Sequence, residues 1–232
     1  MTFRAVAFDF YGTLTMPITR TRQRAHLAPV AAAVGCDPES FRRVWAKSFY
    51  ERATGRFGTV AESLFRVART LGECPDADQV QAACDALRAD TRDYTTLRPE
   101  AISTLTALRA RGLRTAVVSD CTTELADSWP ALEVATHVDV TVFSCVLGRH
   151  KPDPELYRQA LHGLEVPAAA CLYVGDGGSD ELAGAVRAGM AAVRIESAEH
   201  LSYGQRPWVG PRIDGLAAVL DLVGTPDDIT RG

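Results

Sequence analysis

Five short apolar runs constrain the fold of this 232-residue chain more than any other feature. They are rich in Val, Phe and Ala, and most are continuously apolar rather than alternating. Strands of this kind are buried on both faces, as in a parallel sheet covered by helices on each side. The predicted strands are Arg4–Phe10, Thr115–Ser119, Val138–Ser144, Ala170–Gly175 and Ala191–Ile195.

Helical patterns separate the later strands. The segment Pro99–Arg111 places apolar residues on one face and ends at Gly112, a residue typical of helix ends. Asp153-Pro154 combines an N-cap with a proline in the first helical turn, and a third helix is predicted over Ser179–Ala188. This alternation of strand and helix predicts right-handed crossovers and an α/β fold with a doubly wound parallel sheet.

Residues 17–95 contain helical patterns without a convincing strand. Asp37-Pro38 marks the start of one helix, and the capping box Thr59-x-x-Glu62 marks another. An insert after the first strand is expected to form a helical cap over the carboxyl ends of the strands, where ligands bind in such folds. The predicted division is a core of residues 1–16 and 96–224, a cap of residues 17–95 and a loose tail of residues 225–232.

The charge and composition limit the partners. The net charge is −4, so neither nucleic acid nor an anionic membrane is expected to bind. No apolar run is long enough to span a bilayer, the N-terminus does not resemble a signal peptide, and none of the six cysteines forms a C-x-x-C pair. We therefore expect a cytoplasmic protein that acts on a small molecule, as a monomer or a homodimer.

Polar residues follow the predicted strands at four places. Asp9 leads into a Gly-Thr turn, Ser119 ends the second strand, and Lys151 lies in a proline-rich loop. Asp176 and Asp180 flank a Gly-Gly turn after the fourth strand. Each feature alone has an ordinary explanation as a turn, a helix cap or a solvated lysine. Together they predict a site at the carboxyl edge of the sheet, with hard oxygen ligands that suit Mg²⁺.

The order of these motifs resembles the haloacid dehalogenase-like superfamily, whose pattern is D-x-(D/Y/A)-G-T-L, then a hydrophobic residue and S/T, then K-P, then G-D-x-x-x-D. The resemblance implies a Rossmann-like core with strand order 5-4-1-2-3, a helical cap and a covalent intermediate on Asp9, with Lys151 and Ser119 assisting. It also implies that Mg²⁺ binds the side chains of Asp9 and Asp176 and the backbone carbonyl of Tyr11, with Asp180 as a direct or indirect partner.

Tyr11 departs from the phosphatase pattern. Phosphatases of this superfamily have a second aspartate there that protonates the leaving group, and a phenol with a pKa of about 10 is a poor replacement. In having a tyrosine at this position, the sequence resembles the 2-haloacid dehalogenases. Those enzymes need no metal, and their departing halide needs no proton. The acidic cluster of Asp9, Asp176 and Asp180 favours a divalent cation, and therefore a Mg²⁺-dependent phosphatase, over dehalogenation.

Two further alternatives remain open. Relatives that cleave C–P bonds use a cap lysine, and Lys47 is the candidate here; a binding module without catalysis is the other. The remaining candidates for contact with the substrate are Thr13 and Asp120 in the core and Arg42 and Arg43 in the cap.

Overall fold

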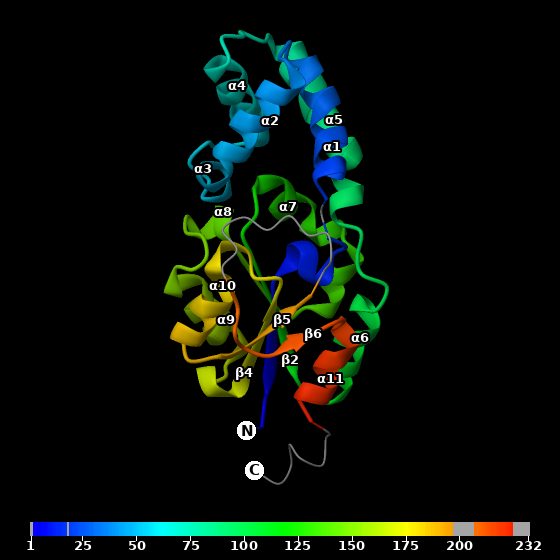
Figure 1. Ribbon diagram of the computed structural model, residues 1–232, viewed down its shortest axis with the longest axis vertical. Helices are drawn as coiled ribbons and strands as arrows, with labels where there is room; N and C mark the ends of the chain where they lie inside the picture. The colour runs from blue at the N-terminus through cyan, green and yellow to red at the C-terminus, as the bar shows by residue number, and fades with distance from the viewer. Residues whose placement is uncertain (1, 18, 197–206, 225–232) are drawn as a thin grey trace.

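The protein contains one six-stranded parallel sheet with a helical layer on each face (Figure 1), as seen in a computed structural model that describes residues 2–17, 19–196 and 207–224. The strand order is β3-β2-β1-β4-β5-β6, and every pairing is parallel. The strands are β1 (Ala5–Phe8), β2 (Arg114–Ser119), β3 (Val140–Phe143), β4 (Cys171–Gly175), β5 (Ala191–Ile195) and β6 (Arg212–Ile213).

This arrangement confirms the predicted fold class. The five predicted strands pair in the expected order, and the structure adds β6 at the edge beside β5. We did not predict β6 because its two residues are too few to show a hydrophobic period.

Alternate side chains of each strand enter two different hydrophobic clusters. In β1, Val6 and Phe8 join the cluster that also contains residues of α6 (Ala101–Ala110) and α11 (Val219–Leu222). Ala5 and Ala7 join the cluster formed with α9 (Pro154–Leu164) and α10 (Glu181–Arg187). Because both faces are buried, most positions of the strands are apolar, which explains their nearly continuous pattern.

The cap is an all-helical insert between β1 and α6, and it lies above the carboxyl ends of the strands (Figure 1). As predicted, the side chain of Asp37 caps a helix, and Thr59 and Glu62 form a capping box. Its hydrophobic cluster, which includes Phe41 and Leu64, is separate from those of the core. Its helices are α1 (Arg20–Ala33), α2 (Pro38–Lys47), α3 (Phe49–Ala53), α4 (Val60–Thr70) and α5 (Ala77–Tyr94).

The two chain segments that connect cap and core lie side by side. Thr15 and Leu97 form an isolated antiparallel bridge, and Arg98 N–H donates to the carbonyl of Leu14 over 2.8 Å. The division at residues 16 and 96 stays a prediction, and the predicted tail lies outside the described residues. Two short helices, α7 (Thr123–Ser128) and α8 (Ser144–Leu147), follow β2 and β3. Phe10–Leu14 forms a wide turn with non-helical backbone angles at Tyr11 and Gly12. Short 3₁₀ turns occupy Trp129–Ala131, Glu133–His137, Ala168–Ala170, Gly178–Asp180 and Leu216–Ala218.

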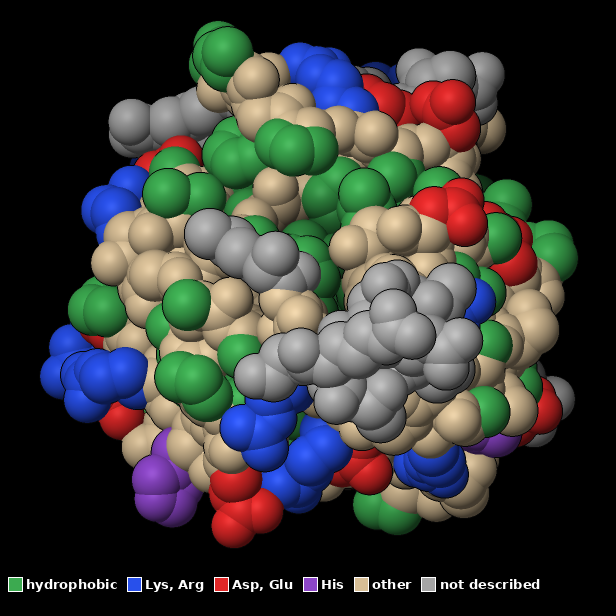
Figure 2. Space-filling view, turned by 90° about the horizontal axis from the view of Figure 1, so that it is seen from below, with side chains coloured by type: hydrophobic (Ala, Val, Ile, Leu, Met, Phe, Trp, Pro, Cys, Tyr) green, Lys and Arg blue, Asp and Glu red, His purple; other side chains and the backbone are tan. Residues whose placement is uncertain are grey.

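The opposite end of the molecule, at the amino ends of the strands, is a separate surface (Figure 2). Acidic and basic side chains are interspersed on this face. A cavity of about 220 Å³ is lined there by Arg4, Arg114 and Glu165 among others, and it is remote from the carboxyl edge of the sheet. In the described part of the chain, no helix is both long enough and apolar enough to cross a membrane.

Candidate active site

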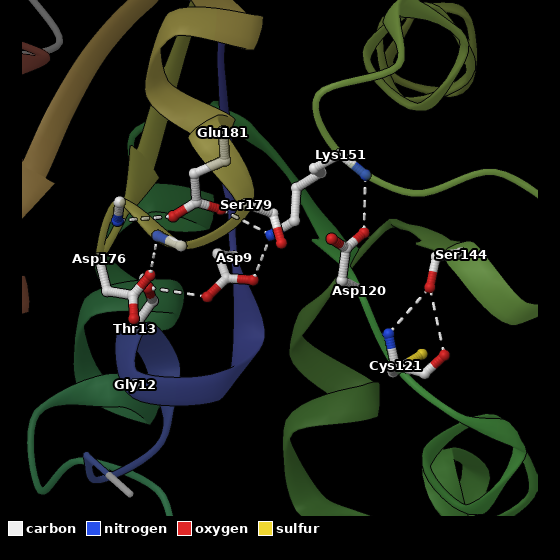
Figure 3. A network of polar contacts seen from close by, with 12 residues as sticks. Asp9, Gly12, Thr13, Asp120, Cys121, Ser144, Lys151, Asp176, Ser179 and Glu181 are labelled. Atoms are coloured by element: carbon white, nitrogen blue, oxygen red, sulfur yellow. Dashed lines mark hydrogen bonds and ion pairs between the residues drawn. The ribbon is translucent and has the colours of Figure 1, made fainter. Parts of the chain in front are cut away.

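Asp9 follows β1 directly and faces the carboxyl edge of the sheet (Figure 3). The turn after it bends at Gly12, whose φ of 78° is favourable for glycine and costly for other residues. This bend directs the Thr13 hydroxyl back to Asp9, so that Thr13 Oγ1 donates to Asp9 Oδ2 over 3.1 Å. Asp9 is 5% exposed, so its carboxylate is held in a fixed place away from bulk water.

Lys151 is the cation of the site. Its Nζ lies 2.6 Å from Asp9 Oδ1 and 2.6 Å from Glu181 Oε2 (Figure 3). Burial favours a lower pKa for Lys151, but the carboxylates of Asp9 and Glu181 outweigh it and hold the pKa well above 10.5. The backbone is fixed as well, because Lys151 N–H donates to Asp120 Oδ1 over 2.8 Å. Lys151 is therefore a permanent, positioned positive charge.

Three buried carboxylates meet at this edge. One oxygen from each of Asp9, Asp176 and Glu181 lies within 4.8 Å of the others. Burial raises the pKa of Asp9 and of Glu181 to about 7, against the lowering effect of Lys151; burial and then the charge of Asp9 raise the pKa of Asp176 to about 6. With all three ionised, one lysine leaves a net charge of −2. Hard oxygen donors with this charge fit a divalent cation such as Mg²⁺.

Glu181 takes the position that the sequence suggested for Asp180. Ser179 and Asp180 both have left-handed backbone angles, with φ of 52° and 54°. After them Glu181 points inward, where it accepts hydrogen bonds from Tyr173 Oη and Gly177 N–H over 2.8 and 2.9 Å. Asp180 is not part of the carboxylate cluster, and its Oδ2 lies 3.6 Å from Arg187.

Ser119 and Asp120 end β2 beside Lys151. Within the described residues, Ser119 Oγ is buried without a hydrogen-bond partner, and so is the second carboxylate oxygen of Asp120. Buried polar atoms nearly always have a hydrogen-bond partner. The hydroxyl of Ser119 is therefore suited to form a hydrogen bond with a bound ligand.

Tyr11 packs against the core cluster and contacts the Phe10 ring edge-on at 5.1 Å. Burial, and after it the charges of Cys121 and Glu124, raise the pKa of Tyr11 well above 10. The phenol therefore stays protonated and is a weak acid.

Arg98 also contacts the turn after Asp9, and it donates to the carbonyl of Gly12 over 2.9 Å. This contact was not predicted, because Arg98 and Gly12 are 86 positions apart and belong to no common sequence motif.

The predicted cap cations lie on α2. Arg42 forms an ion pair with Glu39 at 2.5 Å, and Arg43 donates to Ser40 Oγ over 3.1 Å. Lys47 is exposed at the end of α2.

The cap instead meets the site through Tyr50 of α3. Its ring stacks on His150 at 4.3 Å, and its hydroxyl lies 3.4 Å from Ser179 Oγ. His150 precedes Lys151, and Ser179 lies in the turn between Asp176 and Glu181, so Tyr50 contacts both loops that hold the site's charges. Tyr50 could not be predicted from the sequence, because it shares no motif with either loop.

Fold and site together define a class of protein whose α/β core presents a lysine-bound carboxylate beneath inserted helices. The sequence profile of the haloacid dehalogenase-like hydrolases matches residues 3–189, and the chain belongs to that family.

Curated relatives carry different activities in their names. The haloacid dehalogenase-like hydrolase domain-containing protein 3 of Mus musculus is 31% identical over 66% of this chain and 64% of its own length. The glyceraldehyde 3-phosphate phosphatase of Methanopyrus kandleri is 31% identical over 57% of each chain. The (S)-2-haloacid dehalogenase 1 of Pseudomonas sp. is 27% identical over 83% of this chain and 84% of its own length. The matches to the first two thus span less than two thirds of those proteins.

A solved structure shares the fold. A crystal structure described as a dehalogenase superposes with a TM-score of 0.66 at 22% identity, and the match covers 95% of this chain and 96% of that one. This likeness extends over both the core and the cap, and it supports the fold without deciding the reaction.

Proposed function

We propose that the protein is a Mg²⁺-dependent phosphatase that acts on a small phosphorylated metabolite through an aspartyl-phosphate on Asp9. The observation that carries the proposal is the cluster of Asp9, Asp176 and Glu181, which outnumbers its single lysine. Without a cation these buried carboxylates repel one another and take up protons near neutral pH, as their raised pKa values indicate, whereas a divalent cation would hold them ionised. An anionic substrate would add to that repulsion.

The residues that would hold the ion are the side chains of Asp9 and Asp176 and the backbone carbonyl of Tyr11. Glu181 already accepts from Lys151, Tyr173 and Gly177, so we assign to it the task of fixing Lys151. Asp180 lies by Arg187, so we expect at most an indirect contribution from it. When bound, Mg²⁺ neutralises charge at the site and lets two anions, carboxylate and phosphate, approach each other.

The reaction has two steps in this proposal. A carboxylate oxygen of Asp9 attacks phosphorus, the bond from phosphorus to the leaving oxygen breaks, and that oxygen departs as an anion that takes a proton from solvent. Water then attacks the acyl phosphate, which releases inorganic phosphate and restores Asp9. Lys151 stabilises the charge on the nucleophile and the phosphoryl group. We assign to the hydroxyl of Ser119, which is unpartnered in the described part of the protein, the task of donating to a phosphate oxygen.

Dehalogenation of a 2-haloacid is the second candidate. Tyr11 favours it, because a phenol kept protonated is a poor acid and a departing halide needs no proton. There Asp9 would displace the halide from carbon, and water would hydrolyse the resulting ester. The direct pairing of Lys151 with Asp9 also suits that chemistry without a metal.

The other two alternatives have less support. A C–P cleaving enzyme needs a cap lysine over the site, and Lys47 is exposed at the end of α2. A non-catalytic module would have no need of a nucleophile held at 2.6 Å by a buried lysine, since such pairs are costly to bury. We also propose a cytoplasmic location, and we leave monomer and homodimer as alternatives.

One paired assay tests the proposal. Hydrolysis of p-nitrophenyl phosphate and halide release from 2-chloropropionate are measured with Mg²⁺ and with EDTA. We expect phosphate release that EDTA abolishes and added Mg²⁺ restores. Halide release that EDTA leaves intact would replace the phosphatase by the dehalogenase, and activity on neither substrate, nor on a panel of phosphate esters, would favour the binding module.

A further inference from the structure

Two cysteines lie together beside the active site. Cys121 comes directly after Asp120 at the end of β2, and Cys145 is the second residue of α8 after β3. Their Sγ atoms are 3.9 Å apart, and both are free thiols. Because β2 and β3 are neighbours in the sheet, the pairing joins two loops at its carboxyl edge.

The backbone around the pair is fixed. Ser144 Oγ accepts from Cys121 N–H over 2.9 Å and donates to the Cys121 carbonyl over 3.2 Å (Figure 3). These bonds hold the two loops in register while the sulfur atoms remain unbonded. A disulfide bond is about 2.05 Å long, so the two sulfurs would have to approach by roughly 1.9 Å. A movement of that size requires the two loops that carry the cysteines to shift toward each other.

The two thiols differ in environment. Cys121 is 1% exposed, whereas Cys145 is only partly buried. The two thiols share one hydrogen bond, in which either sulfur could donate, so their difference in exposure is what distinguishes them. Cys145 is therefore the thiol that meets a solvent oxidant first, and Cys121 is the one that completes the bond.

We propose that Cys121 and Cys145 are a modification site, at which a hydroperoxide converts the two thiols to a disulfide and thereby inactivates the enzyme. The sulfur of Cys145 attacks the peroxide oxygen, the O–O bond breaks, and one water or alcohol leaves. The sulfur of Cys121 then attacks the sulfenic acid, the S–O bond breaks, and water leaves. Two thiols lose two electrons and two protons in total, and the peroxide gains them.

The pair is connected to three parts of the site. Cys121 adjoins Asp120, which holds the backbone of Lys151. The Cys145 carbonyl lies against Gly55 of the cap so closely that a Cβ there would be 2.8 Å away, and both sulfurs lie near Tyr11. Drawing the sulfurs together therefore displaces the lysine loop, the cap contact or both. The loss of turnover rests on the proposed phosphatase function, whereas formation of the bond does not.

The test follows the bond and the activity separately. The 232-residue chain, as wild type and as Cys74→Ser to remove the exposed thiol, is treated with one equivalent of hydrogen peroxide. We expect a mass loss of two hydrogens and a Cys121–Cys145 cross-linked peptide after digestion. We also expect kcat/KM for the phosphate ester to fall by about tenfold to 10²-fold, since a misplacement near 1 Å can cost that much. Dithiothreitol should reverse both changes.

Cys145→Ser is the variant that isolates the bond. It is partly exposed and should fold, keep its basal activity within a few fold, and neither lose two hydrogens nor respond reversibly to peroxide. Cys84→Ser, in the cap, should behave like the wild type. No cross-link between Cys121 and Cys145 in the wild type would overturn the modification site, whatever the reaction. A cross-link that leaves turnover unchanged would overturn only the inactivation.

Discussion

The carboxyl edge of the core and the cap above it are built differently. At the core edge, Asp9, Lys151 and Glu181 are almost fully buried and joined by contacts of 2.6 Å. In the cap, Arg42 and Arg43 bond to residues of their own helix, and a separate hydrophobic cluster holds the helices together. The charged groups of the site are therefore held by contacts within the core, and the cap reaches their loops through Tyr50.

This difference predicts where substitutions act. A change at the core edge alters the stabilisation of the transition state and lowers kcat. A change in the cap alters binding that is shared by the ground state and the transition state, and it raises KM. Four substitutions or sets of substitutions test the contrast, and they are considered in order of expected effect.

Asp9→Asn has the largest expected effect. An amide is not a useful nucleophile, and loss of a nucleophile lowers kcat on the order of 10⁴-fold or more. Steady-state kinetics on the phosphate ester measure it, with freshly purified protein to exclude deamidation. Circular dichroism should show an unchanged fold, since Lys151 keeps Glu181 as a partner. Activity above one hundredth of the wild type would rule out Asp9 as the nucleophile.

The second-largest expected effect concerns Tyr11 and the dependence of the rate on the leaving group. Without an aspartate as acid, the enzyme should favour leaving groups that depart as stable anions, because general acid catalysis supplies about 10²–10⁴ in rate. Aryl and acyl phosphates should therefore exceed alkyl phosphates in kcat/KM by a margin of that order. Tyr11→Asp should narrow the gap if the new carboxyl reaches the leaving oxygen, and Tyr11→Phe is the matched control that should not. A flat dependence on leaving-group pKa, where chemistry limits the rate, would contradict this.

The site could be predicted from the sequence wherever a motif follows a strand. The positions of Asp9, Lys151 and Asp176 depend on the sheet, and parallel strands bring their carboxyl ends to one edge. The choice between Asp180 and Glu181 depends instead on two successive left-handed residues, Ser179 and Asp180. Residues other than glycine rarely adopt that conformation, so the left-handed backbone of Ser179 and Asp180 could not be predicted from the sequence.

Glu181→Gln and Asp180→Asn are a matched pair of variants with the third-largest expected effect. They test whether Glu181, and not Asp180, belongs to the site. Glu181 orients Lys151, and loss of a residue that orients a catalytic group costs about 10–10²-fold in activity. Asp180, partly exposed beside Arg187, should change kcat/KM by less than about threefold, as exposed ion pairs contribute little. Glu181→Gln should also lower the melting temperature, because it weakens a buried ion pair. A larger loss in Asp180→Asn would restore Asp180 to the site.

The contact between cap and core could not be predicted because it depends on packing between distant segments. Tyr50 and Ser179 are 129 positions apart. The helices of the cap were predicted from their caps and apolar periods, but those signals describe each helix by itself. That α3 is the helix that contacts the core depends on how the five cap helices pack together, and no local sequence pattern predicts this packing.

Tyr50 gives the smallest expected effects and tests the cap side of the comparison. Its hydroxyl lies 3.4 Å from Ser179 Oγ, long for a hydrogen bond between hydroxyls, so Tyr50→Phe should change kcat/KM by no more than about threefold. Tyr50→Ala also removes the ring stacked on His150, and a stacked pair contributes about 0.5–1.5 kcal/mol, equal to a two- to twelvefold change.

The contrast between core and cap requires that this change appear in KM, with kcat nearly constant. Phe65→Ala, an exposed aromatic side chain on α4, is the control and should leave both constants unchanged. If Tyr50→Ala lowers kcat as strongly as Glu181→Gln does, the cap contact positions the lysine and metal loops during the reaction. Preorganisation would then belong to the closed cap and core together, and not to the core alone.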